Sequence, residues 1–183
     1  AALAAGRHGH LVTINPDAPQ IWYWMIPLAD GLTSVGVVGP DADIAGAGDT
    51  AEARLDALLR RAELMSRVLA NATSARPAGE IIGFSANVKS LVGPSYALLG
   101  NAAEFLDPVF SSGVTIAIKS AALGADLVDR RLKGGAVDWD KEFVEELMLG
   151  VDAFRACVAS WYDGSLQRII FDRPKADTQV TAY

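Results

Sequence analysis

Residues 21–38 read IWYWMIPLADGLTSVGVV, and this stretch decides the fold class. Two runs rich in aromatic and β-branched residues, 21–28 and 32–38, flank an Asp30-Gly31 pair, which is a strong β-hairpin signal. A shorter run of the same kind, 11–14, comes before them and ends in an Asn-Pro-Asp turn signal. The sequence therefore predicts an antiparallel sheet.

A helix and two or three short strands are expected after this sheet. Asp49 and Glu52 have the spacing of a capping box, and apolar residues at helical spacing from Leu55 to Leu69 predict one long helix. Pro77 and Gly79 close this region. The strands are expected around 80–85, 88–91 and 96–99.

The remaining sequence predicts two long helices. The first starts at Gly113 and ends at Lys133-Gly134, and the second runs from Asp138 to Asp163. One face of the first helix consists mostly of small residues, which suggests close packing against a neighbour: Val114, Ala117, Ala121, Ala125 and Val128. The fold class is therefore α+β. We divide the chain into 1–95 (sheet with one helix), 96–135 (strand, turn and helix) and 136–183 (C-terminal helices).

The composition argues against several classes of function. The 183 residues include 16 Lys and Arg against 22 Asp and Glu, giving a formal net charge of -6. A nucleic-acid partner needs a positive face, so none is expected. The single cysteine, Cys157, excludes an internal disulfide and a cysteine-based zinc site. No run reaches the roughly 18 apolar residues of a membrane span, so we expect a cytoplasmic protein.

The acidic loop at 39–49 carries two patterns that we interpret as coincidences. Residues 46–51, GAGDTA, match a loose dinucleotide-binding fingerprint, but the residues before them form no strand to deliver a pyrophosphate to a helix. Five residues also fall at calcium-loop spacing: Asp41, Asp43, Gly46, Asp49 and Glu52. Ala45 occupies a ligand position of that loop, so we expect no metal site.

Residues 22–27, WYWMIP, carry a more specific signal. In a strand, Trp22, Trp24 and Ile26 point to the same face and form an apolar wall. A core strand would explain such a wall. The stretch also resembles the W-x-W-x-I-P signature of flavin-dependent halogenases in all four fixed positions, Trp22, Trp24, Ile26 and Pro27. The resemblance implies that these residues separate the organic substrate from the flavin, beside the flavin site.

Residues 100–114, GNAAEFLDPVFSSGV, follow an apolar strand and open a helix. They resemble the second FAD motif of flavin monooxygenases in its halogenase form. The resemblance implies FAD contacts from the small and turn-forming residues of the motif: Gly100, Asn101, Ala102, Ala103, Asp107, Pro108, Ser111, Gly113 and Val114. Free N–H groups at the helix start would favour an anion, so halide binding is expected at Ser112 and Gly113.

The resemblance implies an FAD-dependent halogenase with a partial FAD-binding fold of the hydroxybenzoate-hydroxylase type. Such an enzyme oxidises halide with a flavin hydroperoxide and halogenates an electron-rich aromatic ring, which can be bound to a carrier. FAD reduction implies a separate flavin reductase. Two alternatives stay open: a non-halogenating FAD-dependent monooxygenase or other oxidoreductase, and a degenerate homologue that only binds.

Three departures from the family pattern refine this expectation. Asn101 stands where the family has an Asp, and loss of that charge predicts weaker FAD binding. Phe110 replaces the Glu of tryptophan halogenases, which favours a phenol or pyrrole substrate. The family's N-terminal G-x-G-x-x-G element and catalytic lysine are not found before Trp22. We therefore interpret the chain as a C-terminal fragment that needs this N-terminal FAD domain and is inactive alone.

Overall fold

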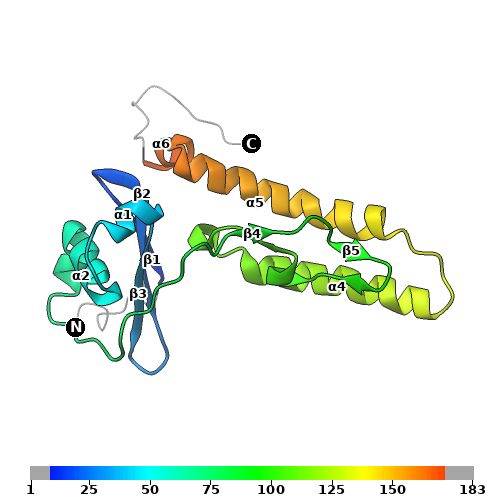
Figure 1. The fold of residues 1–183 in the computed structure, drawn as a ribbon, viewed down its shortest axis with the longest axis horizontal. Coiled ribbons are helices and arrows are strands. Elements are labelled where there is room, and N and C mark those ends of the chain that lie inside the picture. The colour runs from blue at the N-terminus through cyan, green and yellow to red at the C-terminus, as the bar shows by residue number, and fades with distance from the viewer. Residues whose placement is uncertain (1–8, 172–183) are drawn as a thin grey trace. The chain divides into compact units, whose positions relative to one another are not determined.

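The structure, a computed structural model, describes residues 9–171. The chain divides into two compact units, which meet in the sequence between Ile82 and Gly83. Figure 1 shows strands and short helices in the first unit, and two long helices with short strands in the second. Each unit has its own hydrophobic core.

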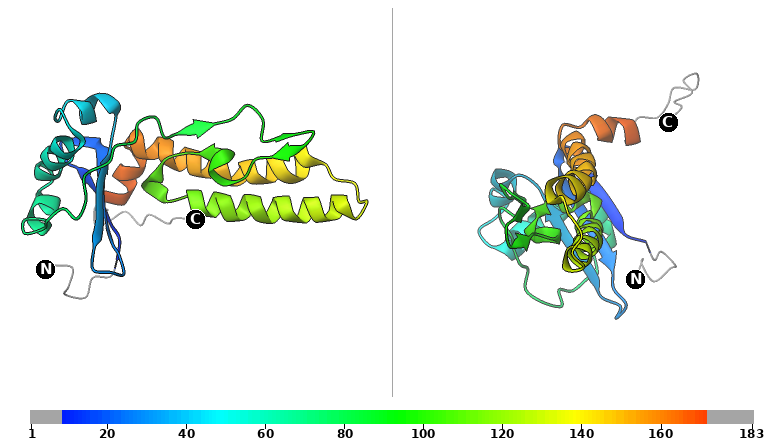
Figure 2. Two further views of the ribbon diagram at one scale, coloured as in Figure 1. Left: turned by 60° about the horizontal axis from the view of Figure 1, so that its bottom comes forward. Right: turned by 90° about the vertical axis from the view of Figure 1, so that its right-hand side faces the viewer.

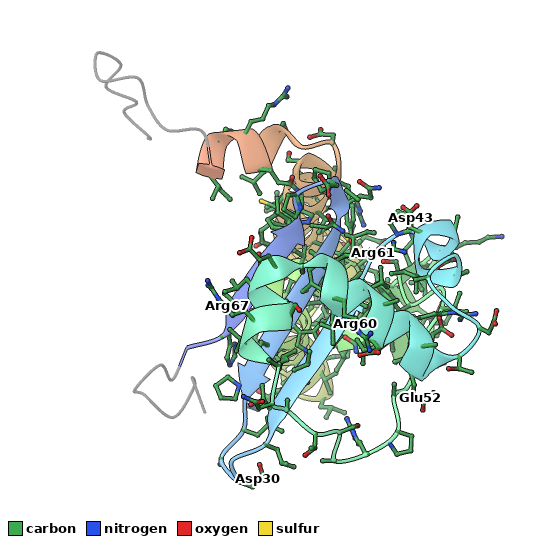
Figure 3. All side chains as sticks on the ribbon, turned by 90° about the vertical axis from the view of Figure 1, so that its left-hand side faces the viewer. Asp30, Asp43, Glu52, Arg60, Arg61 and Arg67 are labelled. Atoms are coloured by element: carbon green, nitrogen blue, oxygen red, sulfur yellow. The ribbon has the colours of Figure 1, made fainter. Side chains whose placement is uncertain are left out.

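The first unit is built on a three-stranded antiparallel sheet, as the hairpin signal predicts. The strands β1 (Leu11–Asn15), β2 (Ala18–Pro27) and β3 (Thr33–Val38) lie in the order β1-β2-β3. Asp30 lies at the tip of the second hairpin (Figure 3), where its carboxylate accepts the N–H of Leu32 at 3.1 Å. Gly31 has φ +82°, a conformation that glycine adopts without strain.

Three helices cover one face of this sheet: α1 (Asp41–Ala45), α2 (Ala51–Arg61) and α3 (Glu63–Val68). Figure 3 shows α2 and α3 lying across the strands and carrying the labelled arginines. The core between sheet and helices consists of Ile21, Tyr23, Met25, Leu58, Ala62 and Met65. The Tyr23 hydroxyl donates to the Leu58 carbonyl at 3.1 Å, and burial raises the pKa of this phenol.

Two sequence expectations for this unit are wrong. The cap of α2 is Thr50 and not Asp49, since the Thr50 hydroxyl accepts the N–H of Ala53 at 3.1 Å. The predicted long helix is two helices, because Ala62 has an extended backbone (φ -93°, ψ 103°) and ends α2. No glycine or proline marks this break in the sequence.

The second unit begins with very short strands. β4 (Ala86–Asn87) pairs with β7 (Glu104–Phe105), and β5 (Val92–Gly93) pairs with β6 (Tyr96–Ala97). The expected strand at 80–85 does not form, and those at 88–91 and 96–99 are replaced by these two-residue ladders. The 3-10 turns η1 (Gly100–Ala102) and η2 (Pro108–Phe110) then lead into the long helices.

The long helices α4 (Gly113–Leu132) and α5 (Glu146–Tyr162) run side by side in opposite directions (Figures 1 and 2). A π-helical turn, η3 (Asp140–Glu145), precedes α5, and the short helix α6 (Ser165–Phe171) follows it. Both ends of α4 and the end of α5 agree with the sequence prediction. The core of this unit joins α4, α5 and the segments before them through Leu91, Ala103, Leu106, Ile116, Leu127, Phe143, Leu147 and Val151.

The buried face of α4 differs from the predicted one. The structure buries Ile116, Ser120, Gly124 and Leu127. Most of the face that was expected to pack is exposed instead, with Val114 71% and Val128 46% exposed. The prediction chose the face on which small residues are most regularly spaced. The structure instead buries the face that carries the Ser120 hydroxyl and Gly124 toward the turn at Gly100.

Ser120 makes the contact on which the turn at Gly100 depends. Its side chain is fully buried, and its hydroxyl accepts the Gly100 N–H at 2.9 Å and donates to the Ala117 carbonyl at 3.1 Å. An apolar residue here would leave the Gly100 N–H buried without an acceptor. Position 120 therefore has a polar side chain on an otherwise apolar face.

Ser120→Ala is expected to lower the free energy of unfolding by roughly 1–3 kcal/mol, because a buried donor loses its partner. Thr115→Ala on the exposed side of the same helix is the control, since it reports the helix-propensity gain of an alanine. Urea unfolding followed by tryptophan fluorescence measures both variants. Equal stability of the two would show that Ser120 does not hold Gly100.

Candidate functional site

The aromatic wall lies on β2, on the sheet face opposite the helices. The Trp22 and Trp24 rings lie 6.0 Å apart between centroids, which confirms that they share a face. Trp22 is 2% exposed, whereas Trp24, Ile26 and Pro27 are half-buried. The structure therefore places all four predicted wall residues in one strand.

Trp24 is held in place from β3. Its indole N–H donates to the Ser34 hydroxyl at 3.1 Å, and its ring covers Gly36, its partner in the ladder. A Cβ at Gly36 would lie 2.1 Å from atoms of this ring, closer than any side chain allows. Glycine at position 36 therefore gives the indole the room to lie flat on the sheet. The location of this wall beside the flavin site stays a prediction.

The turn that starts at Gly100 is tightly packed on α4. Gly100 has φ +54°, and a Cβ there would lie 3.1 Å from the Ala117 side chain. Both the conformation and the space favour glycine. Ala103 is 1% exposed, whereas Asn101 and Ala102 face outward. Gly100 and Ala103 thus anchor the start of the motif, while Asn101 and Ala102 are exposed on its surface.

The two ends of the motif come together in space. A Cβ at Gly113 would lie 3.4 Å from the Asn101 side-chain oxygen, so this amide lies against the start of α4. Ser111 has a left-handed backbone (φ 52°), and Ser112 is 3% exposed. The Ser112 side chain does not cap the helix, which leaves the first-turn N–H groups to other acceptors.

Asp107 is buried and fixes the middle of the motif through two hydrogen bonds. One carboxylate oxygen accepts the Val109 N–H at 2.8 Å, and the other accepts the Tyr162 hydroxyl at 2.8 Å. Asp107 is 7% exposed, and Pro108 begins η2 immediately after it. These residues set the path of the chain toward Ser111. A direct contact of Asp107, Pro108 or Val114 with FAD stays a prediction.

Sequence reasoning missed three side chains that shape this region. Ser120 holds Gly100, Tyr162 holds Asp107, and Arg155 pairs with the buried Glu104 at 3.2 Å. The signal for Ser120 was a hydroxyl among apolar residues at helical spacing. Glu104 was visible as a charged group between apolar neighbours, but its partner Arg155 lies about fifty residues away in the sequence, and Tyr162 lies equally far from Asp107.

The two coincidental patterns in the acidic loop have structural explanations. Asp41 and Asp43 lie in α1, where Asp43 accepts a hydrogen bond from Gln20 at 3.2 Å. The residues before Gly46 are helical, so no strand feeds the glycine pair. Within residues 9–171, no three His, Cys, Asp or Glu side chains are grouped to hold a metal ion. No helix in that range is long and apolar enough to cross a membrane.

The chain is similar to known proteins over much of its length. No protein-family profile matches the chain. It is 33% identical over 109 residues to a 1H-pyrrole-2-carbonyl peptidyl-carrier-protein chlorinase of Pseudomonas fluorescens, covering 59% of this chain and 24% of that protein. It is 30% identical over 126 residues to a flavin-dependent halogenase of Penicillium aethiopicum, covering 65% of this chain and 24% of the relative. The chain thus spans about a quarter of the length of these relatives.

Solved structures share the fold. A flavoprotein/dehydrogenase of Cytophaga hutchinsonii matches with a TM-score of 0.81 and 33% identity, covering 90% of this chain and 44% of that one. The myxobacterial chondrochloren halogenase, an FAD-dependent enzyme, matches with a TM-score of 0.68 and 29% identity, covering 86% of this chain and 43% of that one. The chain is therefore a homologue of one part of the flavin-dependent halogenases, with the fold of that part.

Proposed function

We propose that the protein is part of an FAD-dependent halogenase that acts on an electron-rich aromatic ring. The Gly100–Val114 turn carries this proposal, because it joins a glycine pressed onto α4, an outward-facing amide and an uncapped helix start. The aromatic wall on β2 supports it, since Trp22 and Trp24 form a fixed apolar surface. The chain is homologous to halogenases over most of its length, so a function unrelated to flavin is a poorer explanation of the turn and the wall.

The residues of the turn fit a flavin. Ala102 has a small, outward-facing side chain that lets a planar ring system approach the backbone, whereas Gly100 and Ala103 anchor the turn from inside. The Asn101 amide can accept hydrogen bonds from ribityl hydroxyls. FAD, when bound, supplies the activation of molecular oxygen for halide oxidation. The backbone N–H groups of Gly113 and Val114, at the positive end of the α4 dipole, would hold a halide next to Ser112.

The substrate side is apolar. Phe110 packs edge-to-face on Trp161, with ring centroids 6.1 Å apart, so the position that carries Glu in tryptophan halogenases is committed to a hydrophobic contact. This favours a phenol- or pyrrole-type ring over free tryptophan. The Pseudomonas fluorescens relative acts on a carrier-bound pyrrole, which makes a carrier-bound substrate the first candidate here. A separate flavin reductase would supply reduced FAD.

A second candidate function is an FAD-dependent oxidoreductase that does not halogenate. One observation favours it: the match to a flavoprotein/dehydrogenase at 33% identity. The two functions differ in product, because one adds a halogen to the ring and the other does not. Product analysis therefore distinguishes them.

The proposed function also needs an FAD-binding part beyond these 183 residues, and α4 offers a surface for it. Its apolar residues recur alternately four and three residues apart, and we call this set the α4 stripe: Val114, Ile118, Ala121, Ala125, Val128 and Leu132. Ile118 is 67% and Leu132 81% exposed. Such a period matches packing against another helix, and the two central alanines allow close approach. We propose that the N-terminal FAD domain covers this stripe.

The full-length protein, supplied with FAD, a flavin reductase, NADH, oxygen and bromide or chloride, is expected to halogenate phenol or pyrrole-2-carboxylate derivatives. Mass spectrometry measures the product, and omission of the reductase is the control that should abolish it. A hydroxylated product without halogen would support the second candidate function instead.

Asn101→Asp is expected to bind FAD about tenfold more tightly in the full-length protein, because a charged acceptor strengthens the hydrogen bonds to the ribityl chain. Fluorescence titration with FAD measures the affinity. Asn71→Asp is the control, since it adds the same charge at an exposed position of the first unit. Unchanged or weaker binding by Asn101→Asp would contradict the role given to this residue.

Ile118→Glu is expected to destabilise the full-length protein by several kcal/mol, because it places an unpaired carboxylate in the covered α4 stripe. Lys119→Glu introduces the same side chain one position away, outside the stripe, and should have little effect. Urea unfolding compares the two variants. Equal stability would mean that no part of the protein covers the stripe.

A further inference from the structure

Trp22 and Trp24 belong to one aromatic wall, but the sheet holds them to different degrees. Trp22 is 2% exposed, so packing on all sides fixes its ring. Trp24 is only half-buried, and Val12, its partner on β1, is 46% exposed. A ring with so much open space beside it can turn about its side-chain bonds unless other contacts restrain it. A fixed position of Trp24 therefore needs contacts beyond the packing of the wall.

These contacts come from β3 and engage one edge of the indole. The Nε1–H of Trp24 donates to the Ser34 hydroxyl at 3.1 Å. A Cβ on Gly36 would lie 2.1 Å from Cζ2 and Cη2 and 2.6 Å from Cε2, and these atoms belong to the nitrogen side of the ring system. Trp24 thus leans onto β3 with its nitrogen edge against Ser34 and Gly36. Neither of these two residues is part of the W-x-W-x-I-P signature.

The two contacts together select one orientation of the indole. The outer side-chain torsion of a tryptophan has a roughly two-fold preference, so a half-turn of the ring is an accessible alternative. Such a half-turn would carry Nε1 away from the Ser34 hydroxyl and break the hydrogen bond. A side chain at position 36 would push the ring off the strand in either orientation. Ser34 therefore selects the orientation of Trp24, and Gly36 provides the space for it.

We propose that Ser34 is a positioning residue that, together with Gly36, fixes the Trp24 indole and thereby sets whether the aromatic substrate is halogenated or hydroxylated. The proposal rests on the function proposed above and deepens it, because it assigns this choice of product to two residues of β3. A fixed indole keeps the substrate ring away from the oxygen activated at FAD, whereas the smaller oxidised halogen species passes. A mobile indole lets the ring reach that oxygen.

The two products differ in the fate of the oxygen atoms. In both reactions NADH, through the flavin reductase, supplies one electron pair to one molecule of oxygen. In halogenation a second pair comes from the halide and the ring C–H bond, the ring loses a proton, and both oxygen atoms leave as water. In hydroxylation one oxygen atom enters the ring as a hydroxyl group, the other leaves as water, and the halide is unchanged. The ratio of hydroxylated to halogenated product therefore measures how well the wall excludes the ring from activated oxygen.

The first test follows the indole itself in the full-length protein. Two indoles 6.0 Å apart and inclined at 51° couple their excited states, which gives a positive and a negative band side by side in circular dichroism. The other two tryptophans of these 183 residues, Trp139 and Trp161, have ring contacts with phenylalanines. Subtraction of the spectrum of Trp24→Phe therefore isolates the band pair of Trp22 and Trp24.

Ser34→Ala is expected to weaken this band pair, because the released indole takes up other orientations. Ser34→Thr is expected to keep the band pair, since the hydroxyl acceptor remains. Gly36→Ala should change it independently of Ser34, because the added Cβ displaces the ring. Ser66→Ala, at an exposed position of α3, is the control. An unchanged band pair in Ser34→Ala would overturn the role given to Ser34.

The second test measures the products that the same variants form from phenol with FAD, flavin reductase, NADH, oxygen and bromide. Ser34→Ala is expected to raise the ratio of hydroxylated to brominated product about fivefold, the change in population that loss of one neutral hydrogen bond allows. Ser34→Thr and Ser66→Ala should give the ratio of the unmodified protein. A merely structural role of Ser34 would lower both products together and leave their ratio unchanged, and that result would overturn the proposal.

The two tests keep this proposal apart from the proposed function. The band pair needs neither FAD nor halide, so it decides whether Ser34 holds Trp24 even in a protein that does not halogenate. If the unmodified protein forms no halogenated product, the proposed function is wrong, and control of the product by Ser34 is wrong with it. Halogenation with a product ratio that Ser34→Ala does not change would support the halogenase and reject the present proposal.

Discussion

The second unit depends on the contact between Gly100 and α4. The chain must enter the turn with a left-handed residue pressed against Ala117, and both conditions favour a glycine. Its buried N–H needs an acceptor, and the Ser120 hydroxyl supplies it from one turn further along the helix. Because this contact fixes where the turn begins, it also fixes where Asn101 meets the start of α4.

A second constraint acts from α5. The Tyr162 hydroxyl and the Val109 N–H satisfy the two oxygens of a buried Asp107, so the middle of the motif is tied to the C-terminal helix. A buried carboxylate is stable only when such donors surround it. The turn is thus held at its start by α4 and at its centre by α5. A cofactor site benefits from this arrangement, because the groups that contact the ligand need not be ordered when it binds.

The sequence predicted those features that local chemistry controls. The hairpin follows from Asp30-Gly31, and the limits of α4 follow from Gly113 and Gly134, each a signal within a few residues. Features that depend on distant partners were missed. The break at Ala62 has no local marker, and the buried face of α4 is chosen by Gly100, which lies seventeen residues before Ala117. For the site, the motif residues were predictable, but Ser120, Arg155 and Tyr162 were not, since their roles exist only in the folded chain.

The wrong prediction for α4 itself carries information about the helix. A helix on the surface of a protein has one apolar face and one polar face. α4 has two apolar faces: the one around Ile116 and Leu127 that packs in this unit, and the α4 stripe with Ala121 and Ala125 at its centre. Apolar residues on both sides are typical of a helix inside a larger core. The regular spacing of the stripe is therefore best understood as selection for a second packing partner, which also explains why small residues occupy its middle, where two helices would approach most closely.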